Sequence, residues 1–166
     1  MSQLVDAIRG VLNAAEPLPG LVTGGQPTLE HLTAFKRAGG VAVLDIRDPM
    51  EPQPFRTPED VTAAGLEYRC IPVSAATRTD ATLAAVRAAV QGAIGKKALL
   101  FYCNSGNRVG ATLIPYLMLD RGMDEESATE LAMQCGLRSA EQLEWALDYV
   151  HRQQGTGEQG DRKGKS

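Results

Sequence analysis

One short polar segment of the chain carries side chains that together could perform covalent chemistry on an anion. Its residues are Cys103, Asn104, Ser105, Gly106, Asn107 and Arg108. The apolar run at 98–102 precedes the segment and has the composition of a strand that is buried on both faces. A helical pattern follows at about 109–118. The segment is therefore interpreted as a turn between a buried strand and a helix N-terminus, a position where open α/β sheets bind ligands.

The residue types in this turn favour an anion-binding site with a nucleophile at its base. Backbone N–H groups at a helix start lack partners within the helix, and the helix dipole is positive there. Gly106 supplies the backbone freedom that a tight ring of inward-pointing amides requires. These donors and Arg108 would favour the thiolate of Cys103, and Arg108 could hold two oxygens of a tetrahedral anion. The turn predicts phosphoryl transfer through a cysteinyl-phosphate or sulfur transfer through a persulfide, although a cysteine at a strand end can also be a buried apolar side chain.

A second group of candidate residues follows the apolar run at 41–46, which is also typical of a buried strand. Arg47 and Asp48 come directly after this run, and Glu51 lies in the proline-rich loop that continues from them. Because the carboxyl ends of parallel strands share one edge of a sheet, these residues would belong to the same ligand-binding edge as Cys103. Arg47 could bind the substrate anion or support the residues that do, or it could form an ordinary ion pair within the loop.

Strand and helix patterns alternate along the chain. Strand patterns cover 21–23, 41–46, 67–73 and 98–102, and helical patterns cover 3–14, 27–38, 59–64, 83–94, 109–118 and two segments that begin at 124 and 139. This alternation predicts a three-layer α/β fold with a mainly parallel central sheet and helices on both faces. Pro17 and Pro19 are expected to end the first helix. Pro115 falls inside the helix at 109–118 and predicts a kink or a break there.

The 166 residues are enough for one ordinary domain, which we place at residues 1–154 with its core at about 20–137. Residues 155–166 are rich in glycine and lack apolar side chains, so we expect them to form a disordered tail. The three cysteines are Cys70, Cys103 and Cys135, too few and too scattered for a disulfide framework. Cys70 is expected to be a core residue, or alternatively a resolving thiol for Cys103. Two distant histidines complete no metal site, and no cofactor is implied.

The overall composition narrows the possible partners. A net charge of −3 and a pI of about 5.4 argue against nucleic-acid binding, which usually needs a basic surface. No apolar run approaches the roughly 18 residues that a bilayer crossing requires. Asp6 and Arg9 interrupt the apolar N-terminal residues, which does not fit a secretory signal. We therefore expect a cytoplasmic protein without nucleic-acid or membrane partners, and we leave its oligomeric state open.

The motifs together resemble a known family. The segment from Cys103 to Arg108 is similar to the active-site loop shared by cysteine-dependent phosphatases and rhodaneses. Further matching segments occur in the same order, namely Gly25-Gln26-Pro27-Thr28, Val43-Leu44-Asp45-Ile46-Arg47, Glu51 and Tyr68-Arg69-Cys70-Ile71-Pro72-Val73. Across about residues 20–137 the chain resembles the beta-lactamase-hydrolase-like, phosphatase-like domain family, a branch of the dual-specificity phosphatase fold. The resemblance implies a cysteine-phosphatase-like fold, with Cys103 as nucleophile and Arg108 as anion clamp.

The sequence also departs from the pattern of a tyrosine phosphatase at the loop. That pattern has five residues between its cysteine and arginine, whereas this chain has the four residues at 104–107, a loop length typical of rhodaneses. Tyr102 stands where the phosphatase pattern has a histidine. Val109 replaces the serine or threonine that follows the arginine and steadies the thiolate, and Thr112 is the nearest substitute.

The general acid is the second departure. A phosphatase of this kind usually has an aspartate just after the strand that here ends at Val73, but residues 74–77 contain no carboxylate. Loss of a general acid typically slows such a reaction by about 10²–10⁴-fold. Asp48 and Glu51 are the candidate acids that could protonate the leaving group from another direction.

Three functions follow in order of preference. The first is a phosphatase-like hydrolase that cleaves a phosphomonoester, either a small molecule or a phosphoprotein, through a cysteinyl-phosphate on Cys103. The second is a rhodanese-like sulfurtransferase or persulfide carrier that uses the same cysteine on a sulfur-bearing substrate. The third is an anion-binding module without turnover. The expected substrate-binding residues are Asn104, Ser105, Gly106, Asn107, Arg108 and Arg47.

Overall fold

Five short strands form the central sheet of the protein in a computed structural model, which describes residues 2–165 and the side chains of residues 2–155. The strands are β1 (Ala15–Leu18), β2 (Leu21–Gly24), β3 (Ala42–Asp45), β4 (Glu67–Cys70) and β5 (Leu99–Tyr102). Their order in the sheet is β1-β2-β5-β3-β4. The edge strand β1 pairs antiparallel with β2, and all other pairs are parallel. The predicted mainly parallel sheet is confirmed.

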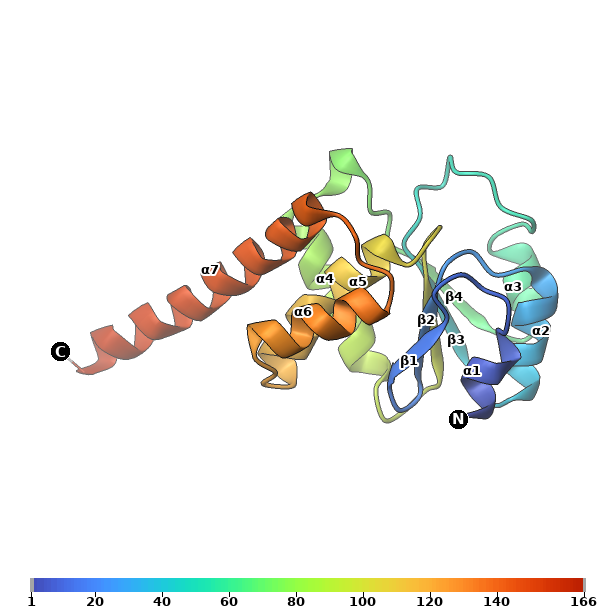
Figure 1. The fold of residues 1–166 in the computed structure, drawn as a ribbon, viewed down its shortest axis with the longest axis horizontal. Helices are drawn as coiled ribbons and strands as arrows, with labels where there is room; N and C mark the ends of the chain where they lie inside the picture. The colour runs from blue at the N-terminus through green and yellow to red at the C-terminus, as the bar shows by residue number, and fades with distance from the viewer. Residues whose placement is uncertain (1, 166) are drawn as a thin grey trace.

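Helices cover both faces of this sheet, as the alternating sequence patterns predict (Figure 1). One face packs against α1 (Gln3–Ala7), α2 (Leu29–Arg37) and α3 (Glu59–Ala63). The other face packs against α4 (Asp80–Ala93), α5 (Asn107–Pro115), the π-helical segment η2 (Tyr116–Asp120), α6 (Glu125–Gln134) and α7 (Ala140–Lys165). A single 3₁₀ turn, η1 (Ala75–Thr77), precedes α4. The three-layer α/β architecture is therefore confirmed.

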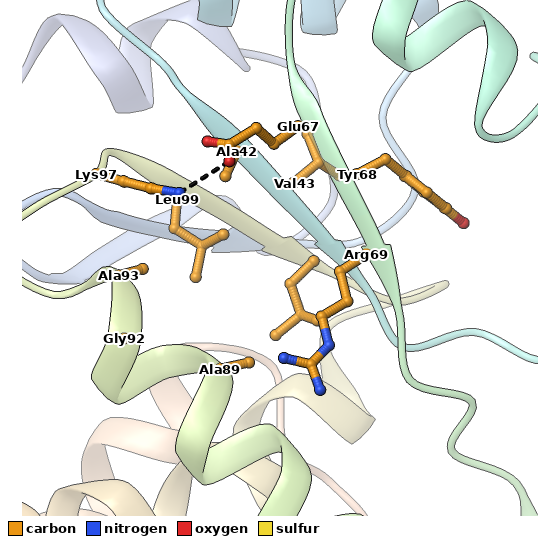
Figure 2. Close-up of a pocket in the computed structure, with 11 residues that line it drawn as sticks. Ala42, Val43, Glu67, Tyr68, Arg69, Ala89, Gly92, Ala93, Lys97 and Leu99 are labelled. Carbon is orange, nitrogen blue, oxygen red and sulfur yellow. Dashed lines mark hydrogen bonds and ion pairs between the residues drawn. The ribbon is translucent and has the colours of Figure 1, made fainter.

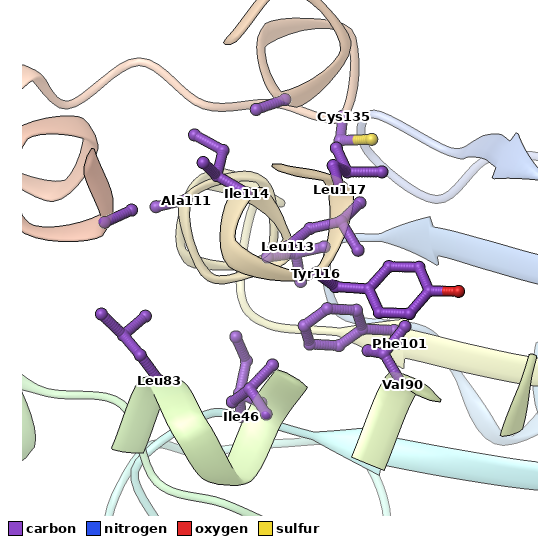
Figure 3. Close-up of a cluster of buried hydrophobic side chains, with 14 of the residues drawn as sticks. Ile46, Leu83, Val90, Phe101, Ala111, Leu113, Ile114, Tyr116, Leu117 and Cys135 are labelled. Carbon is purple, nitrogen blue, oxygen red and sulfur yellow. The ribbon is translucent and has the colours of Figure 1, made fainter. Parts of the chain in front are cut away.

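Strand β5 lies at the centre of the sheet and separates two apolar clusters. All four of its residues are buried. Because side chains alternate along a strand, Leu100 and Tyr102 enter the cluster beneath α1, α2 and α3, whereas Phe101 and Cys103 enter the cluster on the α5 side. Helix α5 is buried on nearly every side, since it lies between the sheet and α6 and α7 (Figure 3). The strand and helix that flank residue 103 thus form the interior of the molecule.

The N-terminal segment differs from the predicted helix at 3–14. Helix α1 ends at Ala7, and the chain then adopts left-handed backbone conformations at Gly10 and Asn13, which interrupt the helical pattern. Strand β1 was not expected, because Pro17 suggested a helix terminator. Proline is tolerated in an edge strand, where one side of the strand needs no ladder hydrogen bond. The predicted strand at 67–73 is also shorter and ends at Cys70.

Pro115 interrupts its helix as expected. The regular α-helical hydrogen bonding of α5 stops at this residue, and a π-helical segment continues from Tyr116. Proline lacks the N–H that would bond to the carbonyl of Ala111, and a π turn is one of the usual ways in which a helix accommodates such a loss.

The C-terminal helix α7 packs its first turns against the core and then extends away from the body of the molecule (Figure 1). Its backbone course reaches Lys165, but the side chains of 156–166 lie outside the described residues. The disordered tail expected at 155–166 stays a prediction. Within residues 2–165, no helix combines the length and hydropathy that a membrane crossing requires.

We predict that Leu113→Ala in α5 lowers the free energy of unfolding by about 2–5 kcal/mol, because it removes a fully buried side chain from the α5 cluster. The matched control is Leu29→Ala, since the side chain of Leu29 is 40% exposed and its truncation is expected to cost about 0.5 kcal/mol or less. Denaturant unfolding followed by circular dichroism measures both values. Equal losses in the two variants would contradict the placement of α5 at the centre of the core.

Candidate active site

The loops that follow the parallel strands meet at one edge of the sheet, where the carboxyl ends of the strands lie. The segment 103–108 follows β5 and leads into α5, residues 25–26 follow β2, residues 46–51 follow β3, and residues 71–74 follow β4. Hydrogen bonds join these four segments directly, as the following contacts show. We call the segment 103–108 the cysteine loop.

The cysteine loop folds its backbone toward the thiol. The side chain of Cys103 is buried, and its sulfur accepts a hydrogen bond from the backbone N–H of Gly106 with an N–S distance of 3.1 Å. Gly106 has a φ of +98°, a left-handed conformation that turns this N–H inward and that residues with a side chain rarely adopt. Helix α5 begins at the next residue, so its unpaired N-terminal amides lie beside the cysteine.

Residues distant in the sequence hold the cysteine loop in place. The side-chain amide of Asn13 donates to the carbonyl of Ser105 at 2.7 Å, and the backbone N–H of Gln26 donates to the carbonyl of Asn104 at 3.0 Å. Gly25 and Gly136 approach the loop so closely that a Cβ at either position would lie within 2.5–3.1 Å of other backbone or side-chain atoms. The loop is therefore clamped from both sides.

Asn107 joins the cysteine loop to the start of α7. Its side-chain oxygen accepts the backbone N–H groups of Arg138 at 2.8 Å and Ser139 at 3.1 Å. The side-chain oxygen of Asn107 therefore serves the fold by fixing the start of α7 against the cysteine loop. Asn104 is exposed at the rim of the loop, and the Ser105 hydroxyl accepts a long bond from the N–H of Asn107 at 3.5 Å.

Arg108 forms a bidentate ion pair with Glu51. Its two terminal nitrogens lie 2.7 and 2.8 Å from the two carboxylate oxygens, and Nη1 also donates to the carbonyl of Val73 at 3.1 Å. The pair lowers the pKa of Glu51 below its ordinary value, mainly through the hydrogen bonds from Arg108. The same carboxylate, followed by a smaller contribution from Cys103, raises the pKa of Arg108. Glu51 is therefore ionised and oriented at neutral pH.

This pairing leaves one edge of the Arg108 guanidinium available. A guanidinium has five N–H donors, and Glu51 and Val73 take both hydrogens of Nη1 and one of Nη2. Among the described residues, the bonds above leave Nε–H and the second hydrogen of Nη2, which point in parallel from the same side of the group. That is the geometry for bidentate recognition of a tetrahedral anion.

Arg47 does not take the substrate-binding position that the sequence suggests. Its side chain is only 2% exposed, it pairs with Asp45, and its Nη1 donates to the carbonyls of Glu51 and Pro52 at 3.2 and 3.1 Å. Tyr68 donates to the other oxygen of Asp45 at 2.8 Å. Because every partner of Arg47 lies inside the protein, its role is to hold the loop that carries Glu51.

The two candidate acids are placed differently. Glu51 lies against Arg108, whereas the carboxylate of Asp48 accepts the backbone N–H of Met50 at 2.9 Å in a partly exposed turn. The backbone N–H of Asp48 donates to Glu51, so the two residues are neighbours in the same turn. Thr112, the expected substitute for the missing serine or threonine, instead donates its hydroxyl to the carbonyl of Arg108 at 2.8 Å. Its hydroxyl is therefore bonded within α5 and not to the thiol.

Cys70 cannot serve as a resolving thiol in this arrangement. In the register of the sheet, Cys70 lies opposite Asp45 of β3, and Asp45 lies opposite Tyr102 of β5. The side chain of Cys70 therefore lies on the same face of the sheet as that of Tyr102. Cys103 occupies the opposite face. The Cys70 thiol contacts the carbonyl of Arg47 at 3.7 Å, and burial raises the pKa of this thiol. All three cysteines are free, and Cys70 is a partly buried structural residue.

Sequence reasoning missed Asn13, Gly25 and Gly136 as determinants of the site. Gly25 belongs to a recognised segment, but nothing local indicates that its backbone touches Asn104. Asn13 and Gly136 lie far from the cysteine loop in the sequence, and their contacts depend on tertiary folding. The only local signal was the residue type, since asparagine and glycine are enriched at left-handed positions.

Comparison with known proteins finds similarity in structure alone. No protein-family model matches the chain, and no curated protein matches it. A DUF442 protein from Shewanella putrefaciens CN-32 superimposes with a TM-score of 0.75 at 19% identity, over 89% of this chain and 97% of that one. Tk-PTP in its active form gives a TM-score of 0.73 at 19% identity, over 84% and 97% of the two chains. TpbA of P. aeruginosa, crystallised with phosphotyrosine, gives 0.65 at 19% identity, over 84% and 83%. The chain thus has a cysteine-phosphatase-like fold.

We predict that Gly106→Ala disrupts the cysteine loop, because the added Cβ would overlap the carbonyl oxygen of Cys135. The left-handed conformation costs about 1–2 kcal/mol, and the overpacking adds about 1–3 kcal/mol to the loss in unfolding free energy. Gly95→Ala is the matched control, since Gly95 has a φ of +76° with nothing within 4 Å of the added Cβ. Thermal or denaturant unfolding compares the two. Equal destabilisation would contradict the close contact between residues 106 and 135.

The ion pair between Glu51 and Arg108 predicts a pH-dependent contribution to stability. The pKa of Glu51 is lowered on folding, so the contribution is complete above the ordinary value of 4.5 and is lost as the pH falls from there through the folded pKa. The wild type should therefore be more stable than Glu51→Gln at pH 7, with the difference shrinking below about pH 4.5. Denaturant titrations between pH 3 and 7 test this, with the exposed Glu144→Gln as the control for removal of one surface carboxylate. A difference that does not change with pH would show that the pair adds nothing to stability.

Proposed function

We propose that the protein is a cysteine-dependent phosphatase that hydrolyses phosphomonoesters through a cysteinyl-phosphate on Cys103. The observation that carries this proposal is the free edge of the Arg108 guanidinium, with the group fixed at its other end by Glu51. This edge and the inward N–H of Gly106 belong to one loop around a buried thiol. The phosphatase-like fold and the phosphotyrosine bound by TpbA support the same chemistry.

In the proposed reaction the Cys103 thiolate attacks the phosphorus atom, and the ester oxygen leaves with the electron pair of the broken P–O bond. Amides of residues 104–108 and the free edge of Arg108 bind the equatorial oxygens, where negative charge is held in the transition state. A proton must reach the leaving oxygen. Water then attacks the cysteinyl-phosphate, so that inorganic phosphate is released and the thiolate is regenerated.

We assign different roles to the two carboxylates near the loop. Glu51 is ionised by its pairing with Arg108, which makes it a poor proton donor and a good positioning residue for the guanidinium. Asp48 has one carboxylate oxygen that accepts the N–H of Met50, and its side chain is partly exposed next to Glu51. Asp48 is therefore the candidate general acid.

The motifs between residues 25 and 73, together with the cysteine loop, support membership of the beta-lactamase-hydrolase-like, phosphatase-like domain family within this fold. The substrate class that we propose is an aryl phosphate, either a small molecule or a phosphotyrosine side chain. An aryl phosphate has a comparatively good leaving group, which suits a site whose general acid does not follow β4 as in the usual pattern.

One specific feature favours sulfur transfer as the second candidate. Only four residues separate Cys103 from Arg108, so the ring of amides is one residue smaller than in a tyrosine phosphatase. In that reaction the Cys103 thiolate would take the outer sulfur of thiosulfate, sulfite would leave, and the persulfide would pass its sulfur to a thiol or cyanide. An anion-binding module without turnover is the remaining alternative.

We predict that the wild type hydrolyses a small aryl phosphate between pH 5 and 7, and that Cys103→Ser abolishes this activity. Arg108→Lys should lower kcat/KM by about 10²–10³-fold, because lysine cannot pair with Glu51 and present a bidentate edge at the same time. The measurement is release of the aryl alcohol by the three proteins, with folding checked by circular dichroism.

Turnover that survives Cys103→Ser would refute the role of Cys103 as the nucleophile. Thiosulfate-dependent activity with a gain of one sulfur atom in the mass of the protein, and no phosphate release, would favour the sulfurtransferase. Phosphate binding without either activity would indicate the binding module.

The roles of Asp48 and Glu51 can be distinguished with two substrates whose leaving groups differ in basicity. We predict that Asp48→Asn slows hydrolysis of a phosphate ester with a basic leaving group, by about 10²-fold or more, while it hardly affects one with a strongly acidic phenol. Glu51→Gln should reduce kcat/KM for both substrates by a similar factor, since it misplaces Arg108 in every case. Steady-state kinetics with the two substrates measure both effects. The opposite pattern would make Glu51 the acid.

A further inference from the structure

A cavity lies between the sheet and α4, and residues of β3, β4 and β5 line it (Figure 2). Its volume is about 220 Å³. The first residues of three strands line it, namely Ala42 of β3, Glu67 of β4 and Leu99 of β5, whereas Cys103 follows the last residue of β5. The cavity therefore lies toward the amino ends of the strands, whereas the candidate active site lies beyond their carboxyl ends.

The cavity exists because small side chains face charged ones across it. Helix α4 contributes Ala89, Gly92 and Ala93, none of which fills the space toward the sheet. On the other side, the edge strand β4 presents Arg69 to this face, in register with Leu44 of β3. Figure 2 shows the side chain of Arg69 extending from β4 toward Ala89 on α4. The result is an apolar floor of Ala42, Leu44 and Leu99 with a guanidinium beside it.

The charges around the cavity leave one cation in excess. Lys97 pairs with Glu67 at 2.8 Å at one end of the cavity. No hydrogen bond or ion pair involves the guanidinium of Arg69 within the part of the chain whose side chains are described. Arg69 is exposed at the rim of this partly open cavity, and a positive group next to an apolar surface matches a molecule that has a negative head and an apolar tail. The volume is below the roughly 300–1,000 Å³ of sites for drug-sized ligands, so the molecule must be small.

We propose that this cavity binds a small amphiphilic carboxylate, of the size of a medium-chain fatty acid. The aliphatic tail lies on Ala42, Leu44 and Leu99, and the carboxylate accepts two hydrogen bonds from Arg69. Charged residues on an edge strand can also prevent sheets from pairing edge to edge, which is the competing explanation for Arg69. The two explanations can be separated by comparing the binding of the whole ligand with the binding of its charged head alone and of its apolar tail alone.

The test is a titration of the full-length protein with octanoate, followed by backbone amide NMR shifts. Saturable shifts are expected at Gly92, Ala93 and Glu67, around the cavity. Acetate carries the head without the tail, and octan-1-ol carries the tail without the charge. Both should bind at least about tenfold more weakly than octanoate, since each lacks one of the two interactions. Octan-1-ol that binds as tightly as octanoate would overturn the proposal.

Variants of α4 locate the site. Gly92→Leu adds a side chain at the lining of the cavity, where the added Cβ meets no atom within 4 Å. Because leucine favours a helix more than glycine does, the Tm should be equal or higher while the octanoate shifts are lost. Gln91→Leu is the matched control on another side of the same helix and should leave binding unchanged. Octanoate binding that survives Gly92→Leu in a folded protein would contradict the assignment.

Arg69→Gln tests the carboxylate contact. It should weaken octanoate binding about tenfold and leave octan-1-ol binding as it is in the wild type. Increased self-association with unchanged octanoate affinity would instead assign Arg69 to protection of the sheet edge. Cys103→Ser should bind octanoate like the wild type, so the outcome is independent of the proposed phosphatase activity.

Discussion

The ion pair between Glu51 and Arg108 is the contact on which the geometry of the candidate site depends. It joins the loop after β3 to the start of α5, and the bond from Arg108 to the carbonyl of Val73 adds the loop after β4. A long arginine side chain has many rotamers, and fixing it costs conformational entropy before any ligand binds. The structure meets this cost in advance, because two carboxylate oxygens and one carbonyl already define the plane of the guanidinium.

The carboxylate of Glu51 is itself held by a network beneath the sheet edge. Asp45, at the end of β3, pairs with the buried Arg47, and Arg47 holds the carbonyls of residues 51 and 52. A buried ion pair is rarely a net source of stability, because the desolvation of both charges opposes their attraction. Its value here is structural specificity, since it defines the path of the proline-rich loop at residues 48–54. The buried pair of Asp45 and Arg47 is therefore explained by the loop position that it defines and not by a gain in stability.

Much of this arrangement was predictable from local patterns, and the exceptions share one physical cause. Continuous apolar runs predict strands β3 and β5, and the chain order of strands and helices predicts the layers. The turn between β5 and α5 was also evident, because strand, small polar residues and helix follow one another directly.

The partners of the side chains could not be predicted from these patterns. Arg47 and Arg108 both follow a buried strand, yet Arg47 is committed to Asp45 and Arg108 to Glu51, and only tertiary distances decide between partners. Strand β1 was missed for a related reason, since its Pro17 is tolerated only because the strand lies at the edge of the sheet.

The charge balance at the sheet edge determines how an anion would be held there. Arg47 is paired with Asp45 and Arg108 with Glu51, so the two arginines bring no excess positive charge to the site. The remaining attraction comes from the two N–H groups of Arg108 that Glu51 and Val73 leave free, and from backbone dipoles: the inward N–H of Gly106, the other amides of the cysteine loop and the N-terminus of α5. Dipoles act over short distances and only along their own directions. The attraction that they exert on an anion therefore depends on backbone geometry much more than the attraction of an unpaired cation does. This dependence explains why Asn13, Gly25, Gly136 and the left-handed Gly106 surround the loop so closely, because a rigid ring of amides has to supply what the neutralised arginines do not.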